Sequence, residues 1–332
     1  MNVACISRTA CLLAIFFVVH VGQTKADADD AMTRGDVLIV LGSPGTDEYR
    51  TTFQDWALNW TIAAETGRCQ TDIVDGASED PVPLQLIEQR ITNLVQESDL
   101  PLWIVLIGHG TFDGKSANFN IAGPDLRSTD LKKWLAPARR PVAIISCFSA
   151  SGAFLDDLSA ANRVVITSTK GGQEVNFSRF GKFLSEAIKE GVADIDKDRQ
   201  VSLLEAFLFA SKQVDGFYES RGQLVTEHAL LDGNGDQLGT RSDAFQGTRV
   251  AAKARNSGVL LDGLKAHQWH LVPNDDDLSL PPEIVQKRNE LELQLEDLRS
   301  RKIDMVEDDY YAQLEVILLQ LARLLPEEVS DE

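Results

Sequence analysis

The sequence predicts an α/β fold, with a doubly wound, mostly parallel sheet flanked by helices and a C-terminal helical hairpin. Three observations carry this prediction. Short β-branched runs alternate with amphipathic segments of helical period along residues 36–210. Two of these runs, at residues 103–107 and 141–147, are almost wholly apolar, which is typical of strands buried on both faces. Beyond about residue 250 the strand pattern stops, and two leucine-rich segments of helical period follow.

The first half of the chain is expected to contain three strands, at residues 36–41, 69–74 and 103–107. Helices over residues 47–66 and 83–96 connect these strands. The apolar residues of the first helix recur at helical spacing and predict one buried face; they are Phe53, Trp56, Ala57, Trp60 and Ala64.

The second half continues the alternation. Strands are expected at residues 141–147 and 163–168, and helices over residues 128–135 and 177–190. Residues 119–123 are expected to form a small hairpin arm between the two halves.

A linker and a helical hairpin are expected over residues 251–332. Pro281 and Pro282 introduce a helical pattern over residues 283–302, and a second pattern covers residues 307–325. The pattern favours an appendage docked on the core, and binding of a helical partner through the hairpin is the alternative.

The charge of the chain excludes several classes of partner. The 332 residues include 51 Asp and Glu against 32 Lys and Arg, which gives a formal net charge of −19. Such a charge argues against nucleic acid and against anionic membrane surfaces. It also leaves many carboxylates available to bind cations.

Residues 1–28 have the features of an export signal. Arg8 precedes an apolar stretch at residues 10–22, and Ala26 and Ala28 form a plausible cleavage site. The stretch is too short for a comfortable transmembrane helix, and no later segment is long and apolar enough to span a bilayer. We therefore expect a secreted or periplasmic protein, with an uncleaved anchor as the alternative.

Two of the predicted strands stop on reactive side chains. Trp103-Ile-Val-Leu-Ile-Gly-His109-Gly110 ends on an imidazole, and Pro141-Val-Ala-Ile-Ile-Ser-Cys147 ends on a thiol. The carboxyl ends of strands in an open α/β sheet form the edge at which ligands bind. A thiol attacks well only as the thiolate, and a nearby imidazole promotes that form. The pair therefore predicts a nucleophile, Cys147, and its base, His109.

Two alternatives compete with this catalytic interpretation. Once the signal is removed, Cys69 and Cys147 are the cysteines that remain, and a disulfide between them would remove the thiolate. The second alternative is that Cys147 is an inert, buried side chain and that His109 has a structural role.

The order of apolar strand, His109-Gly110, second apolar strand and Cys147 resembles that of the legumain-like, caspase-like and gingipain-like cysteine peptidases. The resemblance is strongest to bacterial relatives of legumain and spans residues 36–210. It implies a caspase-hemoglobinase fold over residues 29–250 and a cysteine-type endopeptidase that forms a thioester with a peptide or protein substrate. It also implies that the backbone N–H groups of Gly110 and Cys147 stabilise the oxyanion.

The resemblance extends more weakly to a specificity pocket. Legumain follows its first strand with Asn-Tyr-Arg, where this chain has Glu48-Tyr49-Arg50. By that match Arg50 contacts an Asn or Asp side chain of the substrate; a capping or surface role for Arg50 is the alternative. Glu48 replaces the legumain Asn, and Ile145 stands where legumain has an acidic pocket residue, so the resemblance does not establish asparagine specificity. Glu174 is expected to be an acidic contact in another wall of the pocket.

Residues 194–205 match an EF-hand calcium loop. The ligand positions of such a loop are held by Asp194, Asp196, Asp198, Gln200, Ser202 and Glu205. Carboxylates at alternate positions converge on one ion, and the final Glu binds it through both oxygens. Arg199 stands where these loops have glycine for a sharp turn. We expect structural Ca²⁺ here, with a solvated acidic turn that caps the next helix as the alternative.

Asp232-Gly-Asn-Gly-Asp236 looks like the start of a second such loop. No Glu closes it, although Asp243 falls at the twelfth position, and an Asx-Gly turn explains the segment equally well. Two functions remain at this stage. One is an exported cysteine endopeptidase with a structural calcium loop, and the other is a catalytically inactive, calcium-binding interaction protein with the same fold.

Overall fold

A computed structural model describes residues 33–324 of the chain, except for residues 79, 81 and 251–260. The predicted export signal and the first part of the predicted linker lie outside the described residues. Among the described residues, no helix is both long enough and apolar enough to cross a membrane.

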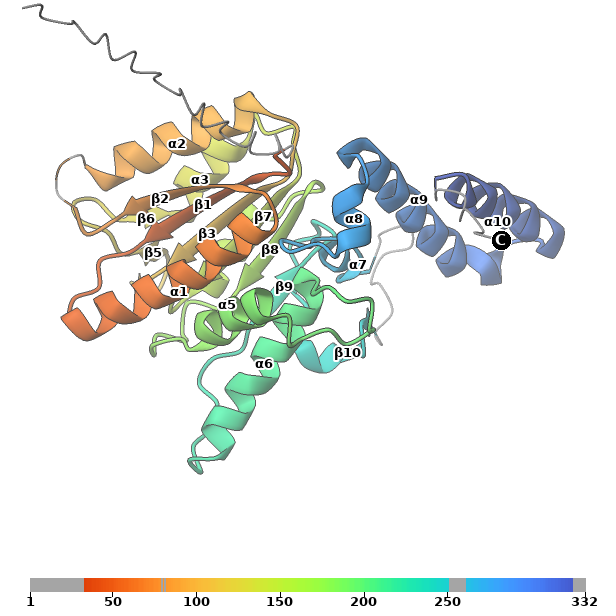
Figure 1. Cartoon of the computed structure of the whole chain (residues 1–332). Helices are drawn as coiled ribbons and strands as arrows, with labels where there is room; N and C mark the ends of the chain where they lie inside the picture. The colour runs from red at the N-terminus through yellow and green to blue at the C-terminus, as the bar shows by residue number, and fades with distance from the viewer. Residues whose placement is uncertain (1–32, 79, 81, 251–260, 325–332) are drawn as a thin grey trace, which may run out of the picture. The chain divides into compact units, whose positions relative to one another are not determined.

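A six-stranded sheet lies at the centre of the fold (Figure 1). Its strands are β1 (Asp36–Leu41), β2 (Gln70–Asp75), β3 (Leu102–Ile107), β7 (Val142–Cys147), β8 (Arg163–Thr167) and β9 (Leu230–Asp232). Their order in space is β2-β1-β3-β7-β8-β9, and all neighbours are parallel except β9, which runs antiparallel to β8. The predicted doubly wound, mostly parallel α/β sheet is confirmed.

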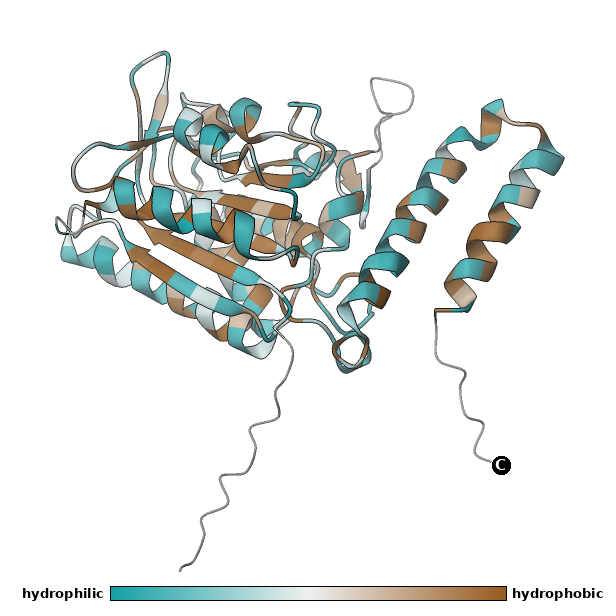
Figure 2. Cartoon of the chain, turned by 90° about the horizontal axis from the view of Figure 1, so that it is seen from above, coloured by the Kyte–Doolittle hydropathy of each residue, from teal (hydrophilic) through white to brown (hydrophobic). Residues whose placement is uncertain are grey.

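Helices cover both faces of this sheet. One face carries α1 (Asp47–Thr66), α5 (Phe180–Glu190) and α6 (Leu203–Glu219), and the other carries α2 (Pro83–Glu97), α3 (Ser128–Leu135) and α4 (Leu155–Leu158). Alternate strand residues divide between the two cores: Val105 and Ile145 face α1, whereas Ile104 and Ile144 face α2. Figure 2 shows the resulting apolar strands between amphipathic helices. Burial on both faces explains why these strands are apolar throughout.

Smaller elements complete the described chain. A three-stranded sheet is formed by β4 (Gly110–Phe112), β5 (Ala117–Phe119) and β6 (Leu126–Arg127), and the hairpin expected at residues 119–123 falls mainly in the connection between β5 and β6. The short strands β10 (Phe245–Gln246) and β11 (Arg249–Val250) pair with each other. The helices α7 (Leu264–His267) and α8 (Asp275–Ser279) precede the predicted hairpin, which is confirmed as α9 (Pro282–Arg301) and α10 (Glu307–Ala322).

Candidate active site at the carboxyl edge of the sheet

The carboxyl ends of β3 and β7 lie side by side. Ile107 is the register partner of Cys147, and the N–H of Gly108 donates to the Cys147 carbonyl at 3.3 Å. A side chain at position 110 would collide with the Ser149 carbonyl and the Phe148 ring, so only glycine allows this approach. The structure therefore brings the two predicted strand ends together at one edge.

His109 is half-buried and held by the main chain. Its Nε2 lies 3.2 Å from the carbonyl oxygen of Pro44, in the loop between β1 and α1. Because a carbonyl only accepts hydrogen bonds, neutral His109 donates from Nε2, and its Nδ1 has no hydrogen-bond partner among the residues that the structure describes. In this tautomer Nδ1 is the nitrogen that can accept a proton.

Aromatic rings surround the imidazole of His109. The ring centroids of Tyr49, Phe53 and Phe177 lie 4.5, 5.2 and 5.8 Å from that of His109. Burial among them lowers the pKa of His109, although the bond to Pro44 opposes this effect. The imidazole is therefore neutral at neutral pH and ready to accept a proton.

Cys147 lies inside the core on the α1 face of the sheet. It is 1 % exposed, and its Cβ packs so closely on Gly181 of α5 that a side chain there would collide with it. Burial raises the pKa of the Cys147 thiol far above its usual range, and the Glu227 carboxylate adds to the effect. The thiol is thus held in its neutral form, which is the opposite of what a cysteine nucleophile requires. Cys69 and Cys147 are both free, so the disulfide alternative is wrong.

The N–H of Cys147 belongs to the sheet. A residue in a parallel pair directs both its N–H and its carbonyl to the same neighbouring strand. Since the Cys147 carbonyl accepts from Gly108 of the β3 chain, its N–H points to the Leu106 carbonyl on β3. This predicted oxyanion donor therefore lies within the ladder.

Hydroxyl groups fix the loop that follows β7. Ser168 Oγ donates to the Phe148 carbonyl at 2.8 Å, and Ser151 Oγ accepts the Ser168 N–H at 3.0 Å. The N–H of Ala150 donates to the Glu174 carbonyl at 2.8 Å, and Ala150 itself has a φ of 63°, which is rare for a residue with a side chain. The run Thr167-Ser168-Thr169 was the available sequence signal for this network.

The two predicted specificity residues have different surroundings. Arg50 lies in the first turn of α1, where its side chain is 46 % exposed and 4.0 Å from Asp47. Glu174 is 10 % exposed, and its carboxylate contacts His228 Nδ1 at 2.5 Å and Lys170 Nζ at 3.5 Å. The aromatic wall of the site comes instead from Tyr49 and from Phe177, just before α5.

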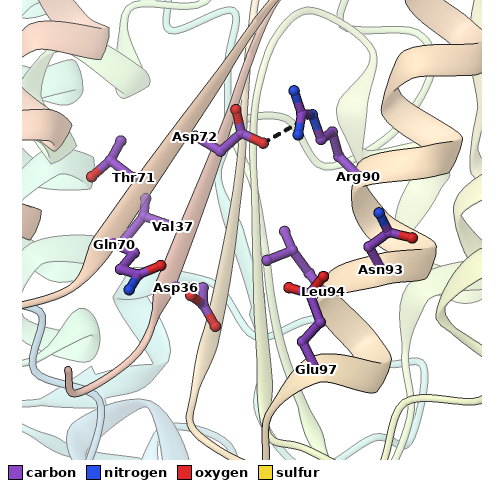
Figure 3. Close-up of a pocket in the computed structure, with 9 residues that line it drawn as sticks. All are labelled: Asp36, Val37, Gln70, Thr71, Asp72, Arg90, Asn93, Leu94 and Glu97. Atoms are coloured by element: carbon purple, nitrogen blue, oxygen red, sulfur yellow. Dashed lines mark ion pairs between the residues drawn. The ribbon is translucent and has the colours of Figure 1, made fainter.

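A polar cavity of about 200 Å³ lies at the opposite edge of the sheet (Figure 3). It is lined by the first residues of β1 and β2 and by the last turns of α2, with an ion pair of 3.2 Å between Asp72 and Arg90. Its lining includes none of the residues that the sequence marks for catalysis. The cavity is therefore separate from the edge that carries His109.

The acidic loop at residues 194–205 brings three carboxylates together. One oxygen each of Asp194, Asp196 and Asp198 lies within 4.8 Å of the others. Arg199 has a φ of 72°, the left-handed conformation for which such loops use glycine. Asp196 has a raised pKa, mainly through burial and then through its carboxylate neighbours.

Glu205 closes this loop through hydrogen bonds. Its Oε1 accepts the N–H groups of Ile195 and Asp196 at 2.7 and 3.2 Å. Its Oε2 accepts the N–H and the hydroxyl of Ser202 at 2.9 and 2.8 Å. The side chain of Gln200, another predicted ligand, accepts the N–H of Asn274. The three aspartates converge, whereas Glu205 is directed to the loop backbone.

The loop that begins at Asp232 repeats this hydrogen-bond pattern. Asp194 accepts the N–H groups three and five residues later, from Lys197 and Arg199, and Asp232 accepts those of Gly235 and Gln237. Asp262 closes the second loop as Glu205 closes the first. It accepts the N–H of the second loop residue, Gly233, and the hydroxyl of the ninth, Thr240.

The chain has structural neighbours at low sequence identity. No model of a known protein family matches the chain, and no curated protein matches it. The chain is similar to the crystal structure of the Drosophila initiator caspase Dronc, at 14% identity and a TM-score of 0.41, over 55% of this chain and 73% of that one. It is also similar to caspase-1 from Spodoptera frugiperda, at 13% identity and a TM-score of 0.36, over 55% of this chain and 77% of that one.

Proposed function

We propose that this protein is an exported endopeptidase that cleaves peptide bonds by acyl transfer at the carboxyl edge of its sheet, with His109 as general base. One observation carries the proposal. The Pro44 carbonyl accepts from His109 Nε2, which leaves Nδ1 unprotonated, and the carboxyl end of β7, where the nucleophile is expected, lies beside the end of β3. The export signal expected from residues 1–28 gives the location.

The edge also offers a donor for the developing oxyanion. His109 accepts the N–H of Asn120 at its carbonyl, and the next pair along this antiparallel ladder is Gly110 with Phe119. Hydrogen-bonded and non-hydrogen-bonded pairs alternate in such ladders, so the N–H of Gly110 points away from β5. It donates to no carbonyl within the described part of the chain, and it would stabilise negative charge on a substrate carbonyl oxygen.

The resemblance to legumain-like peptidases makes Cys147 the expected nucleophile and a thioester the expected intermediate. Attack by this thiol requires it to leave the core and lose its proton, because burial holds it neutral. The same burial favours the second candidate function, a catalytically inactive interaction protein.

Hydrolysis of a fluorogenic peptide library tests the proposal and surveys specificity at the same time. We expect His109→Ala to lower kcat/KM by about 10²- to 10⁴-fold, because the general base is lost. Arg90→Ala, at the opposite edge of the sheet, is the matched control and should retain activity. Equal hydrolysis by the His109 variant would exclude it as the base. A wild-type protein that cleaves none of the peptides would favour the interaction protein.

We also propose that the loop at residues 194–205 binds Ca²⁺ as a structural ion. The carboxylates of Asp194, Asp196 and Asp198 would hold it, with the backbone carbonyl of Gln200. Convergence of three carboxylates supports a hard divalent cation, which would offset their mutual repulsion. The ion would fix the chain between α5 and α6.

Thermal unfolding with and without a chelator tests the calcium proposal. A ligand that binds only the folded state at 100 times its Kd adds about 2.7 kcal/mol of stability, so calcium should raise Tm. The double variant Asp194→Asn/Asp198→Asn should lose this shift. Asp297→Asn, at a partly exposed position of α9 away from the loop in the sequence, should keep it. A wild-type Tm that is the same in calcium and in chelator would exclude the site.

A further inference from the structure

We infer that His228, held by Glu174, is a specificity-determining residue that accepts a hydrogen bond from a neutral polar side chain of the substrate. The inference rests on the proposed peptidase function and names part of its substrate class. It follows from the place of His228 at the carboxyl edge of the sheet, from the way Glu174 holds its imidazole, and from the charges around the pair.

His228 lies beyond the carboxyl end of β8. The strand β9 runs antiparallel to β8, and Thr167 and Leu230 are their register partners at this end. The residues just before Leu230 therefore continue past the last residue of β8, at the edge that also carries His109. Since β3 and β8 are the two neighbours of β7, and β9 lies beyond β8, His109 and His228 adjoin strands on opposite sides of β7.

Hydrogen bonds connect His228 to the loop that follows β7. Its Nδ1 lies 2.5 Å from Oε1 of Glu174, and the main-chain carbonyl of Glu174 accepts the N–H of Ala150 at 2.8 Å. A side chain at position 152 would collide with the backbone of residues 169–171, so the loops after β7 and β8 are in close contact. His228 and Glu174 therefore belong to the same group of loops as the expected nucleophile.

Glu174 fixes the orientation of the His228 imidazole. Its Oε2 accepts the N–H groups of His228 and Lys170, both at 3.0 Å, and Lys170 Nζ lies 3.5 Å from Oε1. Because the carboxylate accepts hydrogen bonds, Nδ1 of His228 donates to it. Neutral His228 then has an unprotonated Nε2, which has no hydrogen-bond partner within the described part of the chain.

The imidazole of His228 is mostly buried but can be reached from solvent. Its side chain is 22 % exposed, and that of Glu174 is 10 % exposed. Because Glu174 already orients the ring, a ligand that binds Nε2 meets a small entropic cost. A substrate donor would satisfy Nε2, whereas an apolar group would leave it desolvated and without a partner. The position therefore discriminates between side chains that donate and side chains of the same shape that do not.

The charges around the pair are balanced. The Lys170 ammonium lies beside the Glu174 carboxylate, and the Arg179 guanidinium interacts electrostatically with the neighbouring carboxylate of Glu227. No net charge remains to attract an ionic side chain, and the two cations repel another ammonium or guanidinium. The expected substrate group is therefore a hydroxyl or a carboxamide.

The spacing of the strands indicates which substrate residue reaches His228. Two strand spacings separate β7 from β9, which is roughly 10 Å. An extended peptide advances about 3.3 Å per residue, so the contacted side chain lies about three residues from the scissile bond.

Hydrolysis of paired peptides by the full chain tests the inference. Each pair is built on a peptide that the wild type cleaves, with Thr or Val, or Asn or Leu, about three residues from the scissile bond on either side. On one side the wild type should favour the donating member about 10-fold in kcat/KM, the value of one net hydrogen bond. The difference should lie in KM, because a contact remote from the reacting atoms binds the ground state and the transition state alike.

His228→Leu should abolish this preference and still cleave the Val and Leu peptides. His228→Gln places a carboxamide oxygen near the position of Nε2 and should keep part of the preference. Glu174→Gln turns one accepting oxygen into a donor and should weaken the preference, as expected of a positioning residue. Gln173→Ala, which removes the exposed side chain next to Glu174, is the matched control and should keep the preference. Thermal melts confirm that each variant folds.

The outcomes separate the inference from the proposed function. A wild type without a preference on either side, or a preference that His228→Leu retains, would overturn the inference while the proposed peptidase stands. An equal loss for all peptides in His228→Leu would indicate a structural role and would overturn it as well. A wild type that cleaves no peptide would overturn both.

Discussion

The loops that begin at Asp194 and Asp232 share the same pattern of backbone hydrogen bonds to the first aspartate. They differ in the part of the chain that supplies the closing carboxylate. In the first, Glu205 lies three residues after the ninth loop residue, Ser202, within the first turn of α6. In the second, the closing carboxylate belongs to Asp262, which is 22 residues beyond Thr240. One loop is therefore completed by its own helix, and the other by a distant segment of the chain. The same backbone conformation of the loop can therefore be closed by a carboxylate from the following helix or by one from a distant segment.

The two closing carboxylates differ in how well their charge is compensated. Glu205 is 1 % exposed, accepts four hydrogen bonds and lies at the N-terminus of α6, where the helix dipole favours an anion. Asp262 is 5 % exposed and accepts two hydrogen bonds. Burial raises the pKa of Asp262 to about 6, and the nearby Asp232 and Asp236 carboxylates add to this shift.

Removal of Glu205 should break the first loop and have the largest effect. Glu205→Ala removes the acceptor of the buried Ser202 N–H and of the N–H groups of Ile195 and Asp196, and we expect a loss of about 3 kcal/mol in the free energy of unfolding. Urea denaturation in chelator measures it. Glu205→Gln keeps one acceptor oxygen and should lose less. A loss below about 1 kcal/mol for the alanine variant would mean that the loop does not depend on this carboxylate.

The second loop should differ from the first in its response to pH. The folded-state pKa of Asp262 lies above its ordinary value of 3.8, so the folded chain holds this proton more tightly than the unfolded chain. The stabilisation that comes from protonated Asp262 is fully present below about pH 4 and is lost as the pH rises through about 6. Each unit of pKa shift is worth about 1.4 kcal/mol, which predicts a swing of roughly 3 kcal/mol.

The contribution of Asp262 is isolated by a difference measurement. Asp262→Asn keeps an acceptor for Gly233 and offers a donor to Thr240, without a titrating group. The free energy of unfolding of the wild type minus that of this variant should fall between pH 4 and pH 6. A difference that is flat across this range would contradict the raised pKa.

The smallest expected effect compares the sixth residue of each loop. Arg199 and Gln237 have φ values of 72° and 67°, which cost a residue with a side chain on the order of 1 kcal/mol. Gln237→Gly should therefore stabilise the protein by about that amount. Arg199→Gly should gain less, because it also loses an exposed ion pair with Asp276. Equal melting temperatures of wild type and Gln237→Gly would show that the loop relaxes this strain elsewhere.

The regular elements were predictable because their signals are local. The helix expected over residues 128–135 has those bounds in α3, and the strand expected at 69–74 is β2, Gln70–Asp75. The strand β9 was missed, because it is three residues long and depends on pairing with β8 and with Thr240. The helix expected from residue 177 begins at Phe180. Phe177 packs against the ring of His109, and the Ser178 hydroxyl donates to the Glu227 carboxylate, so these two residues lie before the helix.

The site was predictable in part. Strand ends and residue types pointed to His109 and to the end of β7, and the structure places these side by side. The sequence left a buried, inert Cys147 as an alternative and did not decide it, because the burial depends on Gly181 of α5 packing against this residue. Asp262 was missed for a similar reason, since no spacing rule connects it to Asp232.

The contact between Pro44 and His109 has a consequence for how this site tolerates mutation. The orienting group is a carbonyl of the main chain, so replacing the side chain at position 44 leaves the acceptor in place. An alanine scan would therefore not reveal that the Pro44 carbonyl orients His109. Natural variation at position 44 is limited by the course of the loop between β1 and α1, and any sequence that preserves this course preserves the orientation of the imidazole.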